Sequence, residues 1–266
     1  MVLGTQRSGA ARKINRFNEP NSMRYLLFFV FTVSAFGQQS SAPKREVHLR
    51  LMAFDNTTIP AESYLFDPAS TQPVAGIAAP IKGYLNHEDV VAQLLGNEIV
   101  FSKSMKAEDA KKAELQLAKV TLPKTGSRFM LIFLPAANQT FRVLPLDDTT
   151  REFPLGSYRV ISLSSFPVKL TLEEKAYEFK PGQSTVISDV PVQENHHSAM
   201  YAYSQVDGKW QRIGSSLWPE LGKKRSVQIF FDNPLSKQTE LRGFRDISPP
   251  VPGAEPTSTP ATANVP

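Results

Sequence analysis

The sequence predicts an all-β protein with an antiparallel β-sandwich architecture. Short stretches of alternating apolar and polar residues recur between residues 46 and 231, and a period of two is typical of strands that bury one face. Residues that favour turns separate these stretches, and only two stretches show a helical pattern. About twelve strands exceed the roughly seven of one immunoglobulin-like sandwich. We therefore expect two tandem immunoglobulin-like modules, residues 44–136 and 137–247, with at most one or two short helices; a single larger jelly roll is the alternative.

The first predicted strand covers residues 46–54, EVHLRLMAF. Its apolar residues Val47, Leu49 and Leu51 alternate with His48, Arg50 and Met52, so we expect a half-buried strand with the latter three on the polar face. Further strands are expected at 63–66, 81–85, 98–101, 113–122, 128–134 and 140–146. The stretch RFMLIFL, 128–134, is apolar on both faces, which places it in the middle of a sheet or between two layers. We expect the first module to end near Ala136-Ala137-Asn138.

Turn chemistry organises the second module. Residues 157–163 and 167–174 alternate, as do the segments on either side of Pro181-Gly182, a pair that matches a type II turn. Asp207-Gly208 separates two further extended segments and predicts a hairpin, because glycine tolerates a positive φ. A strand over 225–231 is expected to stop at Asp232-Asn233-Pro234.

Two stretches carry helix signals. In HEDVVAQLLG, residues 87–96, four apolar residues recur at helical spacing and Gly96 follows as a stop, which predicts one short helix. Residues 106–115, KAEDAKKAEL, form either a second helix or a charged connection between strands.

The first 37 residues predict a leader with a secretory signal peptide. An apolar stretch at 25–36 follows Arg24 and is shorter than the ~20 residues that cross a bilayer. Ala35-Phe36-Gly37 has small residues at the first and third positions, as signal peptidase requires. We expect cleavage before Gln38, a periplasmic or extracellular location and no membrane insertion once the signal is removed. Met1 and Met23 are both candidate starts.

The basic charge of the chain lies mostly in this leader. The formal charge is +5 and the pI is about 9.3. Removing the leader's five basic residues and one acidic residue from totals of 30 and 25 leaves 25 and 24. The remaining protein is nearly neutral, so we expect no nucleic-acid partner.

The two ends of the exported chain are expected to lack a packed structure. Residues 38–45 form a polar spacer, and residues 248–266 carry proline at six positions and almost no large apolar residue. Such composition cannot bury enough surface to offset the entropy of ordering, so we expect a disordered, proline-rich tail.

The acidic pair Asp147-Asp148 raises the possibility of a site. It lies in LDDTTREFPLGSYRVISLSSFPVKLTL, residues 146–172, among threonine, proline and glycine residues that bend chains and bond to nearby backbone. No companion base or metal ligand is local to it. We therefore interpret the pair as part of a turn between two strands.

The same stretch, together with FKPGQ, DGKWQRIGSSLW and RSVQIFF, gives a series of motifs over residues 140–232. They include the acidic pair, Phe153-Pro154, Gly156-Ser157-Tyr158-Arg159 and the later Trp210. This series resembles a group of exported bacterial proteins of unknown function. The resemblance implies an envelope location and a β-rich fold, and it implies no activity.

Several kinds of chemistry lack their usual sequence patterns. There is no cysteine, which excludes disulfides, thiolate metal sites and a cysteine nucleophile. The four histidines, His48, His87, His196 and His197, do not have metal-ligand spacing. Neither G-x-S-x-G nor a phosphate-binding glycine loop occurs. We expect no metal, no cofactor and no catalytic residue, although Glu173-Glu174 with Asp147-Asp148 leave a hydrolase with a carboxylate pair open.

Aromatic residues around the predicted hairpin are the candidate binding residues. Tyr201 and Tyr203 share one strand face, and Trp210 and Trp218 follow the turn. Such side chains offer large contact area at low entropic cost, although core packing uses the same residue types. The leading hypothesis is a non-enzymatic structural or binding protein of the bacterial envelope with an unknown protein or glycan partner. A carbohydrate-binding module that uses these aromatics is the alternative.

Overall fold

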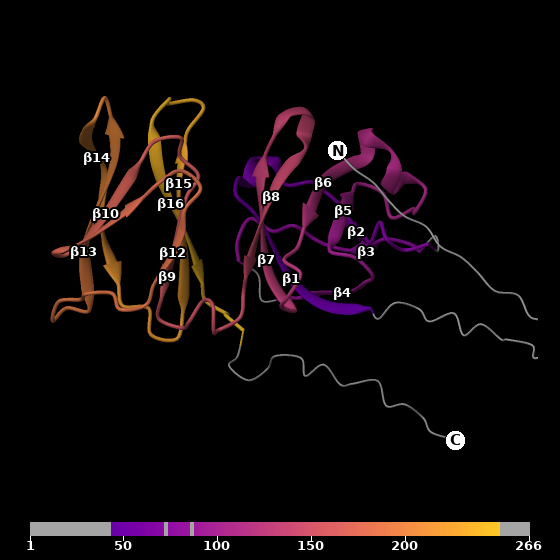
Figure 1. Ribbon diagram of the computed structural model, residues 1–266, viewed down its shortest axis with the longest axis horizontal. Helices are drawn as coiled ribbons and strands as arrows, with labels where there is room; N and C mark the ends of the chain where they lie inside the picture. The colour runs from indigo at the N-terminus through magenta and orange to yellow at the C-terminus, as the bar shows by residue number, and fades with distance from the viewer. Residues whose placement is uncertain (1–43, 72–73, 86–87, 251–266) are drawn as a thin grey trace, which may run out of the picture. The chain divides into compact units, whose positions relative to one another are not determined.

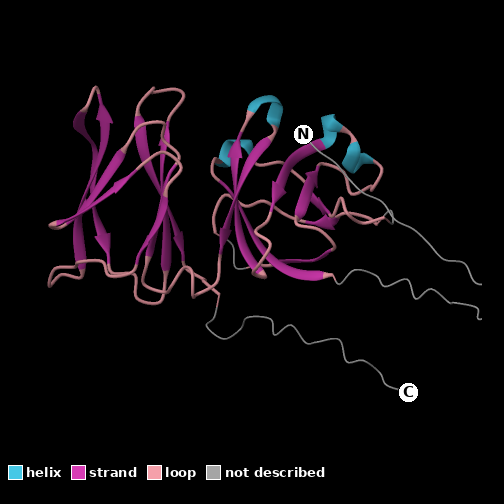
Figure 2. Ribbon diagram, viewed as in Figure 1, coloured by secondary structure: helices cyan, strands magenta, loops and turns pink. Residues whose placement is uncertain are grey.

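The computed structural model describes residues 44–71, 74–85 and 88–250 of the chain, and this part is all-β (Figure 2). The strands are β1 (Arg45–Ala53), β2 (Tyr64–Phe66), β3 (Ile77–Ala78), β4 (Val90–Leu94), β5 (Glu98–Ser102), β6 (Gln116–Thr121), β7 (Arg128–Pro135), β8 (Phe141–Asp147), β9 (Tyr158–Ser162), β10 (Val168–Leu172), β11 (Lys175–Phe179), β12 (Ser184–Ile187), β13 (His197–Val206), β14 (Lys209–Pro219), β15 (Arg225–Asp232) and β16 (Thr239–Asp246). Short 3₁₀ helices are η1 (Asn56–Thr58), η2 (Asp109–Lys111), η3 (Ala113–Leu115) and η4 (Ala137–Gln139).

The first eight strands form one sheet, sheet A, in the order β3-β2-β5-β6-β8-β7-β1-β4 (Figure 1). A single N-terminal core takes buried side chains from seven of these strands, all except β3. Side chains from seven strands can meet in one core only if the sheet is strongly curved. The twist of β-strands permits this curvature. The two edge strands, β3 and β4, then flank the same small cavity.

The last eight strands form two four-stranded sheets that face each other (Figure 1). Sheet B has the order β12-β9-β15-β16, and sheet C has the order β11-β10-β13-β14. A sandwich core lies between them, built from alternate residues such as Val168, Leu170 and Leu172 of β10. The predicted sandwich therefore describes the C-terminal half of the chain.

A third cluster, the junction core, joins sheet A to the outer face of sheet B. It contains Met130 and Ile132 of β7 together with Ile161 of β9 and Val227 and Ile229 of β15. Sheet B is thus covered on both faces, since Val160 of β9 and Phe230 of β15 point into the sandwich core. All described residues fall in one compact unit.

The doubly apolar strand 128–134 lies between two layers, as its sequence predicts. Phe129, Leu131 and Phe133 enter the N-terminal core, and Met130 and Ile132 enter the junction core. Packing between two layers also corrects the prediction that strand 46–54 is half-buried with a polar, solvated face. Its second face is not solvated, because Met52 packs in the junction core and Arg50 is 1% exposed.

The predicted helix over residues 87–96 is wrong. Residues 90–94 form strand β4, which pairs antiparallel with β1. Ala92 and Leu94 point inward while Val91 and Gln93 point out. Burial in this segment therefore alternates with the period of two of a strand and does not follow the 3.6-residue period of a helix. Residues 106–115 are a connection with two short 3₁₀ turns, η2 and η3. Residues 81–85 contribute only a bridge between Lys82 and Met52.

The module boundary and the antiparallel order also differ from expectation. Strands β7 and β8 form a hairpin across Ala136-Ala137-Asn138, so sheet A continues through that point. Three pairs are parallel: β1 with β7, β6 with β8, and β9 with β15. The single eight-stranded sheet A lacks the two separate sheets of an immunoglobulin-like module.

Both predicted turns are present. Gly182 has φ of +79° and Gln183 N donates to Lys180 O at 3.1 Å, as in a type II turn. This turn passes the chain from sheet C to sheet B rather than closing a hairpin. Asp207-Gly208 closes the β13–β14 hairpin. The predicted leader, 1–37, most of the spacer, His87 and the tail beyond Pro250 lie outside the described residues.

Candidate functional site

The outer face of sheet C gathers three of the four predicted aromatic residues. On β13, Tyr201 and Tyr203 alternate with inward-pointing Ala202, and pairing places Gln205 opposite Trp210 of β14. Tyr201 is 37% exposed, and Tyr203 and Trp210 are half-buried. The β13–β14 hairpin therefore brings these residues together as expected. We call Tyr201, Tyr203 and Trp210, with the cations beside them, the aromatic face.

Trp218 does not belong to the aromatic face. It pairs with Ser198 on the inward side of the hairpin and is 5% exposed. Its indole stacks on the ring of Tyr158 with centroids 4.3 Å apart and planes at 14°. Burial raises the pKa of Tyr158 to about 12, and its hydroxyl donates to Pro219 O at 2.6 Å. Trp218 is a core residue because a β-bulge at Ile213 shifts the alternation of β14 by one residue, so Trp218 and Trp210 face opposite sides although they are eight residues apart.

Two cations lie over the aromatic face. Lys169 Nζ is 4.5 Å from the ring centroid of Trp210 and 4.9 Å from that of Tyr203. The guanidinium of Arg212 is 5.9 Å from the ring of Tyr201. Strand pairing sets this geometry, because Lys169 of β10 lies opposite Tyr203, and Tyr203 lies opposite Arg212. Within the described ranges, neither cation has a carboxylate partner.

The two residues of the acidic pair Asp147-Asp148 have different roles in the structure. Asp147 is the predicted turn residue: its Oδ1 accepts from Thr149 N at 2.9 Å and from Thr149 Oγ1 at 2.6 Å. Asp148 is not a turn residue alone. It is fully buried and belongs to a charge cluster with Arg50, Arg225 and Asp246, which are 1%, 0% and 0% exposed.

The charge cluster joins sheet A to sheet B. Arg50 of β1 donates Nε to Asp148 Oδ2 at 2.7 Å and Nη2 to Asp246 Oδ2 at 2.8 Å. Arg225 of β15 donates Nη2 to Asp148 Oδ1 at 2.6 Å and to Asp246 Oδ2 at 2.7 Å. Its guanidinium also lies 4.4 Å from the ring of Phe153. Two buried cations and two buried anions therefore neutralise each other.

The electrostatics of the cluster favour the charged forms of Asp246 and Arg50. Burial alone would raise the pKa of Asp246, but the hydrogen bonds and charges of Arg50 and Arg225 offset it and hold that pKa below its usual value. Burial would likewise lower the pKa of Arg50, and Asp246 and Asp148 raise it instead. The two arginines already occupy these carboxylates, so the cluster has no acid free for catalysis.

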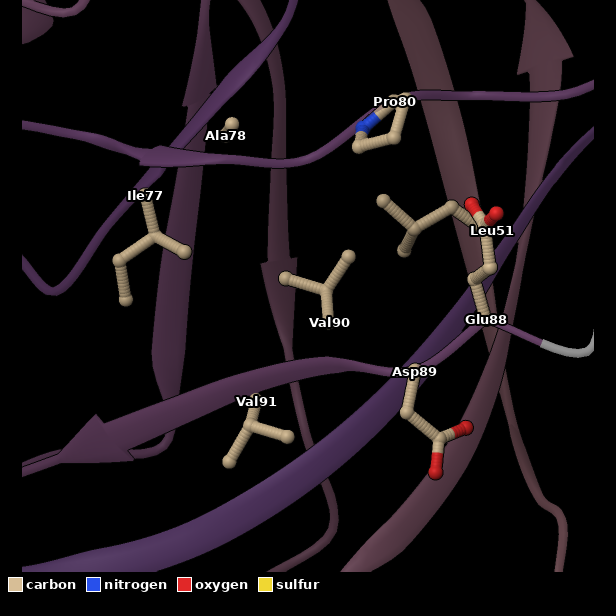
Figure 3. Close-up of a pocket in the computed structure, with 8 residues that line it drawn as sticks. All are labelled: Leu51, Ile77, Ala78, Pro80, Glu88, Asp89, Val90 and Val91. Atoms are coloured by element: carbon tan, nitrogen blue, oxygen red, sulfur yellow. The ribbon is translucent and has the colours of Figure 1, made fainter.

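Two cavities lie beside sheet A. The edge cavity, about 260 Å³, lies between the edge strands β3 and β4 and is lined mainly by Leu51, Ile77, Val90 and Val91 (Figure 3). In Figure 3 the Asp89 carboxylate turns away from the apolar side chains, and it accepts from Arg128 Nη1 at 2.7 Å. The second cavity, about 580 Å³, lies at the starts of β6 and β8. We call it the threonine cavity after Thr57, Thr58 and Thr140 in its lining.

The remaining candidates are dispersed. His196 lies 2.8 Å from Glu220, and His197 Nδ1 lies 2.7 Å from Asn195 O. His48 is half-buried rather than solvated, 3.4 Å from Asp89. Glu173 occupies the β10–β11 turn with a positive φ. In the part of the chain that the structure describes, no three acidic or histidine side chains are grouped as for a metal ion.

The sequence and the structure were compared with known proteins. No protein-family model matches the sequence, and no curated protein is similar to it. Among solved structures, a "putative cell adhesion protein" from Bacteroides uniformis is similar over 76% of this chain and 98% of that chain, with 10% identity and a TM-score of 0.19. A likeness at that TM-score supports no argument about function. Within the described residues, no helix is both long and apolar enough to span a membrane.

Proposed function

We propose that this protein is an exported, non-enzymatic binding protein of the bacterial envelope, and that the aromatic face of sheet C is the surface that contacts its partner. The leader sequence supports export. The partner that this surface fits best is a protein with an acidic patch. The observation that supports this most directly is Lys169, held over two aromatic rings and without a carboxylate partner in the described residues.

The residue types of the aromatic face match those of binding hot spots. Tryptophan, tyrosine and arginine are the types that contribute most to protein interfaces. Strands on a packed sandwich fix these side chains in advance, which lowers the entropic cost of binding. Two unpaired cations beside the rings would meet a partner's carboxylates, and a cation between rings and a carboxylate gains from both.

The experiment is a comparison of partner recovery. Protein with a purification tag is expressed in the source bacterium, and bound envelope proteins are identified for wild type, Lys169→Glu and Arg212→Glu. We expect a salt-sensitive partner that is lost from both variants. Lys223→Glu, in the exposed turn before β15, is the matched control and retains the partner. Equal recovery with all three variants would remove the aromatic face from consideration.

A carbohydrate-binding function is the second candidate, favoured by the exposure of Tyr201 and by Trp210 lying on the same face. Sugar rings stack on free aromatic faces, whereas Lys169 covers one side of Trp210 and Tyr203. A sugar would therefore have to stack beside or displace this lysine. Glycan binding that disappears on Trp210→Ala, with the fold retained, would favour this candidate over a protein partner.

The hydrolase alternative has no comparable support. Glu173, in the β10–β11 turn, accepts hydrogen bonds from Gln193 Nε2 in the segment before β13 and from Ala199 N of β13. Asp148 is enclosed by arginines in the charge cluster. Each acid is thus committed to a structural partner, in a different element.

A further inference from the structure

We propose that the threonine cavity is a binding site for a neutral saccharide. The site lies on sheet A and is independent of the aromatic face, so this inference does not rest on the proposed function. Its volume, about 580 Å³, falls within the roughly 300–1,000 Å³ of small-molecule sites. Segments distant in sequence form it: the residues after η1, the start of β6, and the η4 loop that leads into β8.

Irregular backbone opens the sheet at this cavity. Strands β6 and β8 pair only at Ala118–Phe141 and Lys119–Arg142, so the residues that precede these pairs leave a gap. Leu117 is the extra residue where the β5–β6 register shifts. Bulges of this kind are frequent beside functional sites.

The rim of the cavity holds a strained conformation. Asn138 and Gln139 both have φ of 57°, in the left-handed region. Asparagine tolerates that region, but a glutamine there is strained. Strain of this kind persists where the surrounding structure imposes it, and it clusters at ligand sites. Gln139 lines the cavity, and its amide has no hydrogen-bond partner among the described residues.

The polar groups of the rim match a ligand that both donates and accepts hydrogen bonds. The hydroxyls of Thr57, Thr58 and Thr140 already donate their single proton, to Asp55 Oδ1 at 2.8 Å, Asp55 O at 3.0 Å and Ala137 O at 2.7 Å. Each therefore offers lone pairs to a ligand. Gln139 offers amide hydrogens, so acceptors and donors lie side by side. Ligand hydroxyl groups satisfy both.

The balanced charge of the cavity lining and the apolar residues at its base favour a neutral sugar over an ion. Glu62 and Lys103, one of each sign, line the cavity and leave it without net charge. Glu62 Oε2 accepts from Tyr64 at 3.1 Å and leaves its second oxygen for a ligand. The floor is apolar, with Leu117 1% and Phe141 7% exposed. A sugar ring presents hydroxyls at its rim and C–H groups on its face, which matches this division.

The experiment distinguishes the effect of Gln139 on backbone strain from its effect on ligand binding. Purified protein is titrated with neutral hexoses and N-acetylhexosamines, with a uronic acid and free amino acids as comparison ligands, and binding is followed by calorimetry and by amide shifts at Leu117 and Phe141. We expect a neutral saccharide to bind at millimolar concentration or below. Gln139→Gly should weaken that binding at least ~10-fold, because it removes the amide, while its Tm stays equal to wild type or rises, because glycine relieves the left-handed strain.

Two control variants complete the design. Lys237 has φ of 58° in the turn between β15 and β16, so Lys237→Gly relieves similar strain and should bind the saccharide as wild type does. Trp210→Ala should also bind normally, which separates this site from the aromatic face. Binding of the uronic acid or amino acids in place of neutral sugars, no saccharide binding at millimolar concentration, or unchanged binding by Gln139→Gly would each overturn the proposal.

Discussion

Asp246 keeps its charge in a fully buried position because two guanidinium groups surround it. Arg50 and Arg225 supply hydrogen bonds of 2.7 to 3.0 Å to its two oxygens. Taking an ion out of water costs several kcal/mol, and only close pairing offsets that cost. The charge cluster therefore tolerates the loss of no single member, and it specifies one way for β1, β15 and β16 to meet.

Replacing Asp246 by asparagine should destabilise the protein by about 3–5 kcal/mol, because it leaves a buried positive charge without its partner. The measurement is urea unfolding of wild type and variant. Glu98→Gln is the matched control: its pair with Lys119 is solvent-exposed, at 41% and 58% of the side chains, and should contribute about 0–1 kcal/mol. Similar losses from the two substitutions would contradict the role given to the charge cluster.

The lowered pKa of Asp246 predicts how stability depends on pH. In the unfolded chain an aspartate titrates near 3.9, and in the fold its pKa is lower. Its contribution is therefore complete above about pH 4 and is lost as the pH falls through the folded value. The urea midpoint of wild type should drop in this acid range, and that of Asp246→Asn should drop less. Parallel curves would show that other groups govern acid unfolding.

Asp147 and Asp148 show what a sequence reveals about single residues. Asp147 bonds to Thr149 two positions later, a local interaction that adjacent residues predict. Asp148 bonds to residues 98 and 77 positions away, and no local pattern carries that information. The one hint is Met52 on the supposed polar face of 46–54, which indicates that this face is buried and that Arg50 needs a partner.

At the scale of elements, turns are the part of the fold that sequence predicts best. Pro181-Gly182 and Asp207-Gly208 both adopt the expected conformations, with φ of 79° and 74° at the glycines. Only glycine adopts such angles without strain, so the requirement is local. The destination of each strand is not local: β11 and β12 flank one turn and yet join different sheets.

Gly182→Ala should destabilise the protein by about 1–2 kcal/mol, because alanine is strained at a positive φ. Gly214→Ala is the control. An added methyl group would meet nothing within 4 Å at either glycine, and only Gly182 has a positive φ. Thermal unfolding of both variants tests the difference, and an equal change in Tm would exclude the backbone angle as its cause.

Strand β4 shows why the helix prediction failed. Residues 90–94, VVAQL, fit both a helical and a strand period, and two adjacent β-branched valines favour the strand. Pairing with β1 decides between them. By contrast, the β13–β14 hairpin follows from one turn and a period of two, which place three of the four candidate residues on one face. Trp218 leaves that face because of the β-bulge in β14, which no local sequence pattern indicates.

At the scale of the whole molecule, the boundary between the two halves of the chain cannot be located from the strand pattern, because it depends on which strands pair. Strand β7 pairs with β1 and with β8, so the chain stays in sheet A until residue 147. Sheet B then receives β9, β12, β15 and β16, and its outer face packs in the junction core. Arg242 of β16 adds a further contact, donating to Phe54 O at 3.0 Å. Both a buried apolar cluster and a buried charge cluster therefore connect the halves.

These connections predict that the two halves of the chain unfold together. Two tandem modules joined by a linker would unfold independently. One unit with a shared core unfolds in a single cooperative transition, for which the calorimetric and van't Hoff enthalpies agree.

Differential scanning calorimetry of the purified protein tests this claim most directly. We expect one transition, with a ratio of calorimetric to van't Hoff enthalpy of about 1. Two resolved transitions, one for sheet A and one for the sandwich, would contradict the account.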